Sequence, residues 1–238
     1  MIEGGRSGAP SPGDVAAAGG NEVRPGIYYL AGLDVWQKPV LVVGSGPVAV
    51  RKVKGLRSAG ARVTMVAPGA EDVPEDVVAW RRPFREGDLD GMCLAVAATD
   101  DPAVNARVAR AAAARGIWVN VVDDPQQGTM VVPATFRRGR LSIAISTGGA
   151  SPALASKLRE QLEPQFGSEH ARLVDLLWRL RVEWEDRAID AGLSQSKRAA
   201  AWRAVVDAPL LDLLRAGRDE QAEALARSLL EQCLRSGR

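Results

Sequence analysis

The chain has 238 residues, a formal net charge of +2 at pH 7, 46% hydrophobic residues and 25% charged residues. Its length suits one or two globular domains, and its composition excludes a wholly disordered chain and a fibrous repeat. The near balance of charge argues against a protein that binds nucleic acid along an extended basic surface. Two cysteines and one histidine exclude a zinc finger and a disulfide scaffold, so we expect no metal site and a cytoplasmic location.

The start of the chain has the composition of a tail. Glu3, Arg6 and Asp14 interrupt it, and it lacks the apolar segment of a secretory signal. Residues 1–25 are therefore predicted to be disordered. No stretch approaches the ~20 apolar residues that cross a bilayer, so we expect no membrane association.

Residues 26–123 alternate between strand-like and helix-like patterns. The continuous apolar run Pro39–Val43 is typical of a strand buried on both faces of a parallel sheet, and a helix that stops at Gly60 follows it. Asp101 and Pro102 then provide a cap and a first-turn proline for a helix over about 103–114. Further strands are predicted at 62–67, 77–80, 94–98 and 117–122. This alternation indicates a doubly wound α/β domain.

Beyond residue 123 the pattern changes. Segments 130–136 and 141–146 are strand-like and flank a short turn, which predicts an antiparallel hairpin. Ser151 and Pro152 then cap and open a helix over 153–162. We expect residues 124–165 to form a small α+β region for dimerisation and substrate binding, and 166–238 to be a helical C-terminal region.

A glycine motif lies between the first strand and the first helix. Gly44, Gly46 and Ala49 form the GxGxxA version of the dinucleotide fingerprint, and Pro47 and Val48 lie within it. The first glycine permits a tight turn, the second lets a pyrophosphate approach the backbone, and the small third residue lets the helix pack on the strand. The alternative is a purely structural turn. Because a strand precedes the motif and a helix follows it, we favour a bound dinucleotide.

The sequence does not distinguish NAD from NADP. NAD-binding domains usually place an acidic residue at the end of the second strand, where it binds the adenosine ribose. Here Glu71 and Asp72 come slightly late. No arginine stands at this strand end to bind a 2′-phosphate either, so the choice stays open.

Two further features permit either a chemical or a structural role. Asp123 follows a buried strand at the carboxyl edge of the sheet, where it can act as a partly desolvated general base or belong to an Asp-rich turn. Thr147, Gly148 and Gly149 precede a capped helix, where they form either an anion cradle of backbone amides or an ordinary entry loop.

Several stretches together resemble the precorrin-2 dehydrogenases of sirohaem biosynthesis, which also form the N-terminal module of sirohaem synthases. The similarity covers residues 27 to about 217. The matching stretches are Tyr28-Tyr29-Leu30, VLVVGSGPVAVRKVKGLRSAGARVTMVAP (40–68), LAVAATDDPAVNARVARAA (94–112), NVVDDPQQGTMVVPATFRRGRLSIAISTGGASPALASKLREQLE (120–163) and APLLDLLRAG (208–217).

The resemblance implies an NAD-binding Rossmann domain, NAD-dependent oxidation of precorrin-2 to sirohydrochlorin, and an intertwined homodimer. It implies that Asp123 of the NVVD stretch is catalytic and that the tetrapyrrole lies near Asn120, Thr147, Gly148 and Gly149. The residues implied to bind the cofactor are Gly44, Gly46, Pro47, Val48, Ala49, Ala67, Pro68, Gly69, Ala98, Thr99 and Asp100.

The sequence leaves other functions open. Some family members also insert Fe²⁺ into sirohydrochlorin, so iron as a second substrate stays open. The length predicts a stand-alone dehydrogenase without a methyltransferase module. The main alternative is a regulatory Rossmann module that senses NAD without catalysis, against which Asp123 and the loop at Thr147 argue. A different Rossmann dehydrogenase is disfavoured because it would need a catalytic His or Lys.

Overall fold

The computed structural model describes residues 28–71 and 73–236, so the predicted tail at 1–25 lies outside the described residues. The chain divides into two compact units between Val132 and Pro133, rather than at residues 123 and 165. Residues 124–132 belong to the first unit. The backbone amides of Thr129 and Met130 hold this segment by donating to the carbonyl of Val119, at 2.9 and 3.1 Å.

The first unit is built on a five-stranded sheet in the order β3-β2-β1-β4-β5, with every neighbouring pair parallel. This is the predicted doubly wound α/β fold, with the strand order of a Rossmann domain. The strands are β1 (Pro39–Val43), β2 (Arg62–Val66), β3 (Val78–Trp80), β4 (Leu94–Ala97) and β5 (Trp118–Val121).

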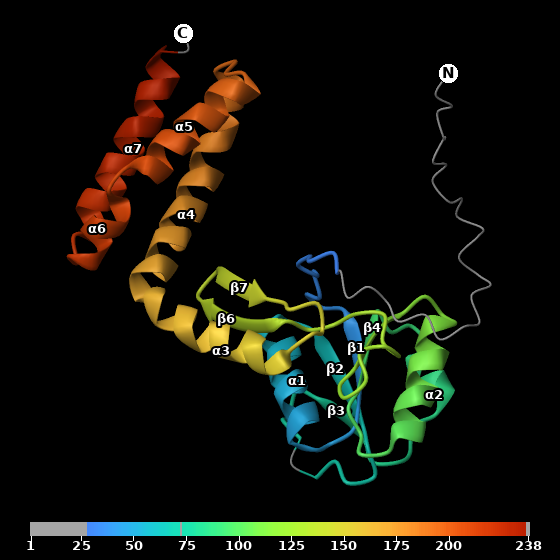
Figure 1. Cartoon of the computed structure of the whole chain (residues 1–238). Coiled ribbons are helices and arrows are strands. Elements are labelled where there is room, and N and C mark those ends of the chain that lie inside the picture. The colour runs from blue at the N-terminus through green and yellow to red at the C-terminus, as the bar shows by residue number, and fades with distance from the viewer. Residues whose placement is uncertain (1–27, 72, 237–238) are drawn as a thin grey trace, which may run out of the picture. The chain divides into compact units, whose positions relative to one another are not determined.

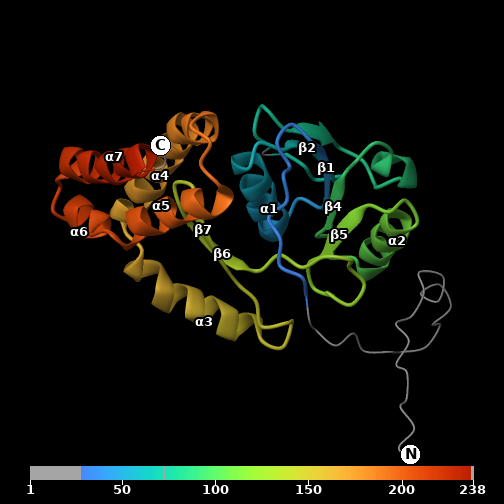
Figure 2. The ribbon, with the colours of Figure 1, turned by 90° about the horizontal axis from the view of Figure 1, so that it is seen from above.

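Helices cover both faces of this sheet, α1 (Pro47–Ser58) on one side and α2 (Pro102–Ala113) on the other (Figure 2). Alternate residues of β1 show why. Val40 and Val42 pack in the cluster that contains residues of α1, and Leu41 and Val43 pack in the cluster that contains residues of α2. Because successive side chains of a strand point to opposite faces, a strand covered on both faces is apolar throughout.

Two details of the first unit differ from the sequence prediction. A short 3-10 helix, η2 (Glu86–Leu89), follows β3 and was not predicted. The hairpin strand predicted from residue 130 begins only at Ala134. The reason is that residues 128–130 fold back on β5, where the Thr129 hydroxyl accepts a hydrogen bond from the Val119 amide at 2.8 Å.

The second unit begins with an antiparallel hairpin, β6 (Ala134–Arg138) and β7 (Leu141–Ile145), as predicted. Gly139 turns it with φ of +58°. Helix α3 (Pro152–Leu162) follows and lies along the hairpin (Figure 1). It begins as the sequence predicts, because the Ser151 side chain accepts a hydrogen bond from the Leu154 amide and Pro152 occupies the first turn. A 3-10 turn, η3 (Glu163–Gln165), ends it.

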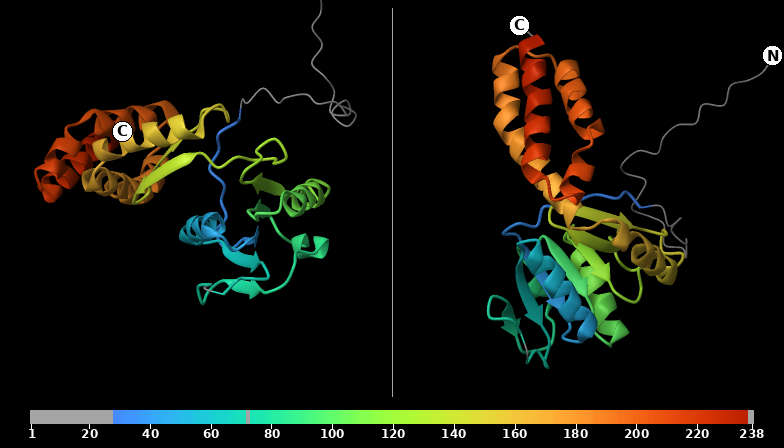
Figure 3. Two further views of the ribbon diagram at one scale, coloured as in Figure 1. Left: turned by 60° about the horizontal axis from the view of Figure 1, so that its bottom comes forward. Right: turned by 90° about the vertical axis from the view of Figure 1, so that its left-hand side faces the viewer.

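The rest of the second unit is helical, as predicted. Its helices are α4 (Ser168–Asp190), α5 (Gln195–Asp207), α6 (Leu210–Arg215) and α7 (Asp219–Ser236), with α4, α5 and α7 side by side (Figure 3). Their common core centres on Trp184 of α4, which is 2% exposed and donates through Nε1 to the Leu230 carbonyl at 3.2 Å. The Trp202 ring stands edge-on to it at 5.9 Å.

Candidate active site

The turn between β1 and α1 is shaped by two glycines with different surroundings. Gly44 has φ of +121°, and a Cβ there would collide with the carbonyl of Ala98. Gly46 is extended, and a Cβ there would meet nothing within 4 Å. The fold therefore requires a glycine at position 44. At position 46 it does not, so the small residue leaves room beside the backbone for something other than this chain.

A cavity of about 340 Å³ opens at this turn, at the carboxyl ends of β1, β2 and β4. This is the edge of an open α/β sheet at which ligands bind, beside the point where the strand order reverses. Eight of the residues predicted to bind the cofactor line the cavity, namely Gly44, Gly46, Ala67, Pro68, Gly69, Ala98, Thr99 and Asp100. Their contact with a cofactor stays a prediction.

Three other predicted cofactor residues do not line the cavity. Pro47 and Val48 form the first turn of α1, and Ala49 is fully buried against the sheet. The position of Ala49 matches the packing role of the third fingerprint residue. Sequence reasoning missed Ser45, Pro83, Phe84, Val104 and Arg107, which also line the cavity.

One wall of the cavity is the turn between β4 and α2, fixed by the buried Asn105. Its Oδ1 accepts from the Thr99 amide at 3.1 Å and from the Thr99 hydroxyl at 2.8 Å, and its Nδ2 donates to the Thr99 carbonyl at 2.9 Å. Asp101 caps α2 by accepting from the Ala103 amide at 2.8 Å. These bonds leave the turn little freedom to move.

Phe84 also lines the cavity, and Arg107 holds it in place. Arg107 donates to the Phe84 carbonyl at 2.8 Å and lies over its ring, 5.4 Å from the centroid. Arg82 binds the buried Asp88 through two hydrogen bonds of 2.7 and 2.8 Å, and the Arg85 amide donates to the same carboxylate at 2.8 Å. Burial by itself raises the pKa of Asp88, but these hydrogen bonds outweigh it and lower the pKa overall.

The cavity fits a dinucleotide phosphate on three counts. Gly46 presents bare backbone, the first turn of α1 contains no acidic residue, and no side chain caps that helix. The amide groups of this turn are thus available to an anion, and the helix dipole favours negative charge there.

Asp123 lies just beyond β5, at the same carboxyl edge of the sheet. It is exposed rather than partly desolvated, and no hydrogen bond or ion pair joins its side chain to another described residue. Asn120, on β5, is only 5% exposed and donates to the Met130 carbonyl at 3.4 Å. Its Oδ1 is buried without a partner among the described residues. Substrate contact by Asn120 stays a prediction.

The loop from Thr147 to Gly149 belongs to the second unit. Gly148 and Gly149 have φ of +64° and +86°, and the Thr147 hydroxyl closes the loop by donating to the Ser151 carbonyl at 3.0 Å and accepting from the Ser151 amide at 3.1 Å. These bonds fit the entry loop of α3. Substrate binding by Thr147, Gly148 and Gly149 stays a prediction.

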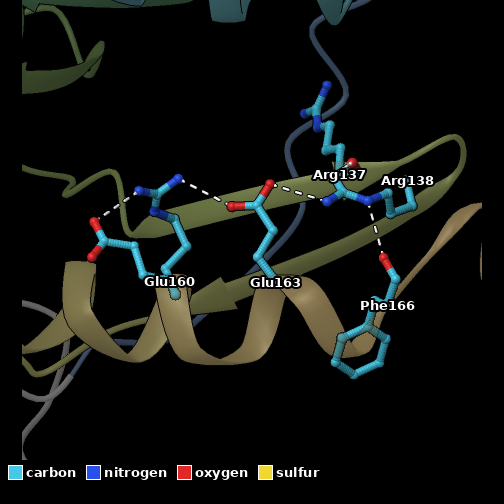
Figure 4. A network of polar contacts seen from close by, with 6 residues as sticks. Arg137, Arg138, Glu160, Glu163 and Phe166 are labelled. Atoms are coloured by element: carbon cyan, nitrogen blue, oxygen red, sulfur yellow. Dashed lines mark hydrogen bonds and ion pairs between the residues drawn. The ribbon is translucent and has the colours of Figure 1, made fainter.

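The hairpin arginines differ in how they are held (Figure 4). Arg138 donates to the Phe166 carbonyl at 3.0 Å and to Glu163 at 3.2 Å, which joins β6 to the end of α3. Arg140 pairs with Asp175 at 3.2 Å. The guanidinium of Arg137 points away from this network and has no partner among the described residues.

Known proteins with related sequences connect the site to one pathway. Residues 32–134 match the NAD(P)-binding family model NAD_binding_7, and residues 138–165 match the model "Sirohaem biosynthesis protein central". The siroheme synthase of Azotobacter vinelandii is 37% identical over 80% of this chain, and that of Methylococcus capsulatus is 41% identical over 81%. The solved structure of SirC, precorrin-2 dehydrogenase, is 29% identical with a TM-score of 0.64, over 87% of this chain and 98% of that one.

The chain is therefore similar to proteins of sirohaem biosynthesis, both in its NAD(P)-binding part and in its central part. It spans 42% and 40% of the length of the two siroheme synthases. The dinucleotide fingerprint lies within the NAD(P)-binding model, and α3 lies within the central model, so both parts of the family pattern are present.

In the described part of the chain, no group of three or more His, Cys, Asp or Glu side chains is arranged to hold a metal ion. No helix there is both long and apolar enough to cross a bilayer.

Proposed function

We propose that this chain oxidises precorrin-2 to sirohydrochlorin with NAD as the acceptor. The observation that carries the proposal is the cavity at the Gly44–Gly46 turn, in a chain that covers 98% of SirC, precorrin-2 dehydrogenase. The oxidation removes a hydride and a proton from the substrate and yields sirohydrochlorin, NADH and H⁺.

The first unit binds and orients the cofactor in this proposal. The amides at the start of α1 bind the pyrophosphate, and Gly46 lets the pyrophosphate approach the backbone because it has no side chain. The walls at Phe84 and Thr99 hold the adenosine half. When bound, the nicotinamide supplies the hydride acceptor.

Asp123 is the proposed base. Its carboxylate lies at the carboxyl edge of the sheet, where an open α/β fold places its chemistry, and no described residue occupies its oxygens. It can therefore accept the proton that the substrate loses when the hydride leaves.

The test compares two neighbouring carboxylates. Asp123→Asn should lower the rate of sirohydrochlorin formation, followed by absorbance, by about 100-fold or more and leave NAD affinity unchanged. Asp124→Asn is the matched control, because Asp124 serves the local turn by accepting from Gln127 Nε2 at 2.7 Å. Full turnover by Asp123→Asn would overturn its assigned role. If the wild type binds NAD but shows no turnover, the result would favour the alternative function, a regulatory module that senses NAD without catalysis.

Iron insertion is a separate proposal that rests on the same carboxylate, which can also accept pyrrole N–H protons. The assay supplies sirohydrochlorin and Fe²⁺ without NAD. A rate equal to that without protein would restrict the function to oxidation.

The cytoplasmic location of the protein stays a prediction.

We also propose a homodimer. One face of α4 exposes Trp178, Val182 and Ile189, at 50%, 61% and 53% of their surfaces. These positions are four and seven residues apart, so they share one side of the helix, as in the apolar seam between paired helices. Sedimentation should show a dimer that Val182→Glu weakens. Val206→Glu, on α5, is the control because Val206 is equally exposed, at 65%, but lies on another helix.

A further inference from the structure

The end of β2 in the first unit is unusual for an NAD site. An acidic side chain commonly stands there and binds the ribose 2′-hydroxyl, and it would repel a 2′-phosphate. In this chain the lining residues at that end are Ala67, Pro68 and Gly69. None of them carries a charge.

A cation occupies the neighbourhood instead. Strand β3 pairs in parallel with β2, so the two strands end side by side, and Arg81 directly follows β3. Its Nε donates to the carbonyl of Ala70 at 2.9 Å, one residue beyond the cavity wall at Gly69. The end of β2 itself has no arginine, as the sequence indicates, and Arg81 comes from the adjacent strand.

The geometry leaves the binding groups of Arg81 available. The residue is exposed, and its two terminal amino groups bond to no other described residue. A guanidinium anchored by Nε presents its terminal N–H groups in a fixed plane, which suits a phosphate. The Ser45 hydroxyl lies near the same strand end, since its Oγ is 3.8 Å from the position that a Cβ on Gly69 would take.

We propose that this site accepts a 2′-phosphorylated dinucleotide as well as NAD, with Arg81 and Ser45 binding the 2′-phosphate. This inference rests on the proposed function, because it requires that a dinucleotide occupies the cavity at all. Arg81 would then set cofactor choice, while the Gly44–Gly46 turn binds the pyrophosphate common to both dinucleotides.

The test measures affinity by isothermal titration and needs no turnover. Its ligands are NAD, NADP, 5′-AMP and 2′,5′-ADP, the last two differing only in the 2′-phosphate. The wild type should bind NADP within tenfold of NAD. Arg81→Gln should weaken NADP and 2′,5′-ADP by about tenfold or more, the effect of one charge-assisted hydrogen bond, and change NAD and 5′-AMP by less than threefold.

Arg62→Gln is the matched control. Arg62 is also exposed, and Arg62→Gln removes the same charge as Arg81→Gln. Arg62 begins β2, so it lies at the amino ends of the strands, away from the cavity. It should leave all four affinities within twofold. Ser45→Ala should weaken NADP more than NAD, by a smaller factor than Arg81→Gln.

The outcomes separate the inference from the proposed function. Binding of NAD with NADP more than 100-fold weaker, or equal effects of Arg81→Gln and Arg62→Gln, would overturn the inference and leave the proposed function standing. Failure of the wild type to bind any of these ligands would overturn both.

Discussion

The two units of the chain use charged side chains in different ways. In the second unit, arginines join different helices: Arg172 pairs with Asp219, Arg179 with Glu223, Arg187 with Glu231, Arg198 with Glu185 and Arg227 with Glu183. Most of these side chains are substantially exposed. In the first unit, the most buried pair, Arg82 and Asp88, lies in the segment that bears the cavity wall.

The two units should therefore differ in which substitutions affect their stability and their binding site. The first unit depends on a few backbone positions that shape its turns, and an error there changes the site. The second unit depends on apolar residues at helical spacing, and its exposed ion pairs each contribute little.

The largest effect should come from Gly44→Ala. A Cβ at φ of +121° is strained and would also collide with the Ala98 carbonyl, so we expect a loss of about 4–5 kcal/mol in the stability of the first unit. Gly46→Ala is the control, because its Cβ meets nothing within 4 Å. It should keep the wild-type melting temperature and lose NAD affinity. Thermal unfolding and NAD titration measure both, and equal melting temperatures of the two variants would contradict the contrast.

The next effect lies in the second unit. Trp184→Ala removes a ring that is 2% exposed and leaves the Leu230 carbonyl without its donor, which should cost about 3–4 kcal/mol. NAD affinity should stay within twofold of the wild type, because no residue of the second unit lines the cavity. Trp178→Ala, at a half-exposed ring of the same helix, should shift the melting temperature much less. A large loss of NAD affinity in Trp184→Ala would show that the units depend on each other.

Much of the first unit could be predicted from local signals. The apolar run at Pro39–Val43 predicts both ends of β1 correctly, and Asp101 with Pro102 marks the start of α2. These signals work because the period of a strand, the capping of a helix and the constraint of proline act over a few residues.

The missed parts depend on contacts between distant segments. Arg81 lies near the end of β2 only because β3 is the neighbour of β2 in the sheet, and Arg107 reaches Phe84 from α2, 23 residues further along the chain. No local sequence pattern predicts the order of the strands in the sheet. Had the order been inferred from the fold class, the residue following β3 would have been a candidate for the site. The fold-back of residues 128–130 onto β5 likewise depends on one hydroxyl, that of Thr129.

A smaller effect, and one that depends on pH, should come from Asp88→Asn. The variant loses the charged acceptor of Arg82, which should cost about 1–3 kcal/mol and weaken NAD binding by loosening the wall at Phe84. Because the pKa of Asp88 is lowered in the folded state, its contribution is present above the unfolded value of about 4 and is lost as the pH falls below it.

Chemical denaturation at pH 7 and pH 3 measures this effect. The wild type should be more stable than Asp88→Asn at pH 7, and the difference should shrink at pH 3. Asp90→Asn is the control, because Asp90 lies two residues on in an exposed pair with Arg115. A difference that is independent of pH would contradict the assignment.

The smallest effect should come from the ion pairs of the second unit, even where they form a network. Arg227 binds Glu183 at 2.6 Å and Glu223 at 2.7 Å, and its hydrogen bonds are the largest cause of the lowered pKa of both carboxyl groups. All three side chains are at least 30% exposed, so water and salt screen them. Arg227→Gln should therefore shift the melting temperature by about 2 °C or less at 0.15 M salt, and by less still at 1 M salt. A shift as large as that of Trp184→Ala, unchanged by salt, would mean that the charges rather than the apolar core hold these helices together.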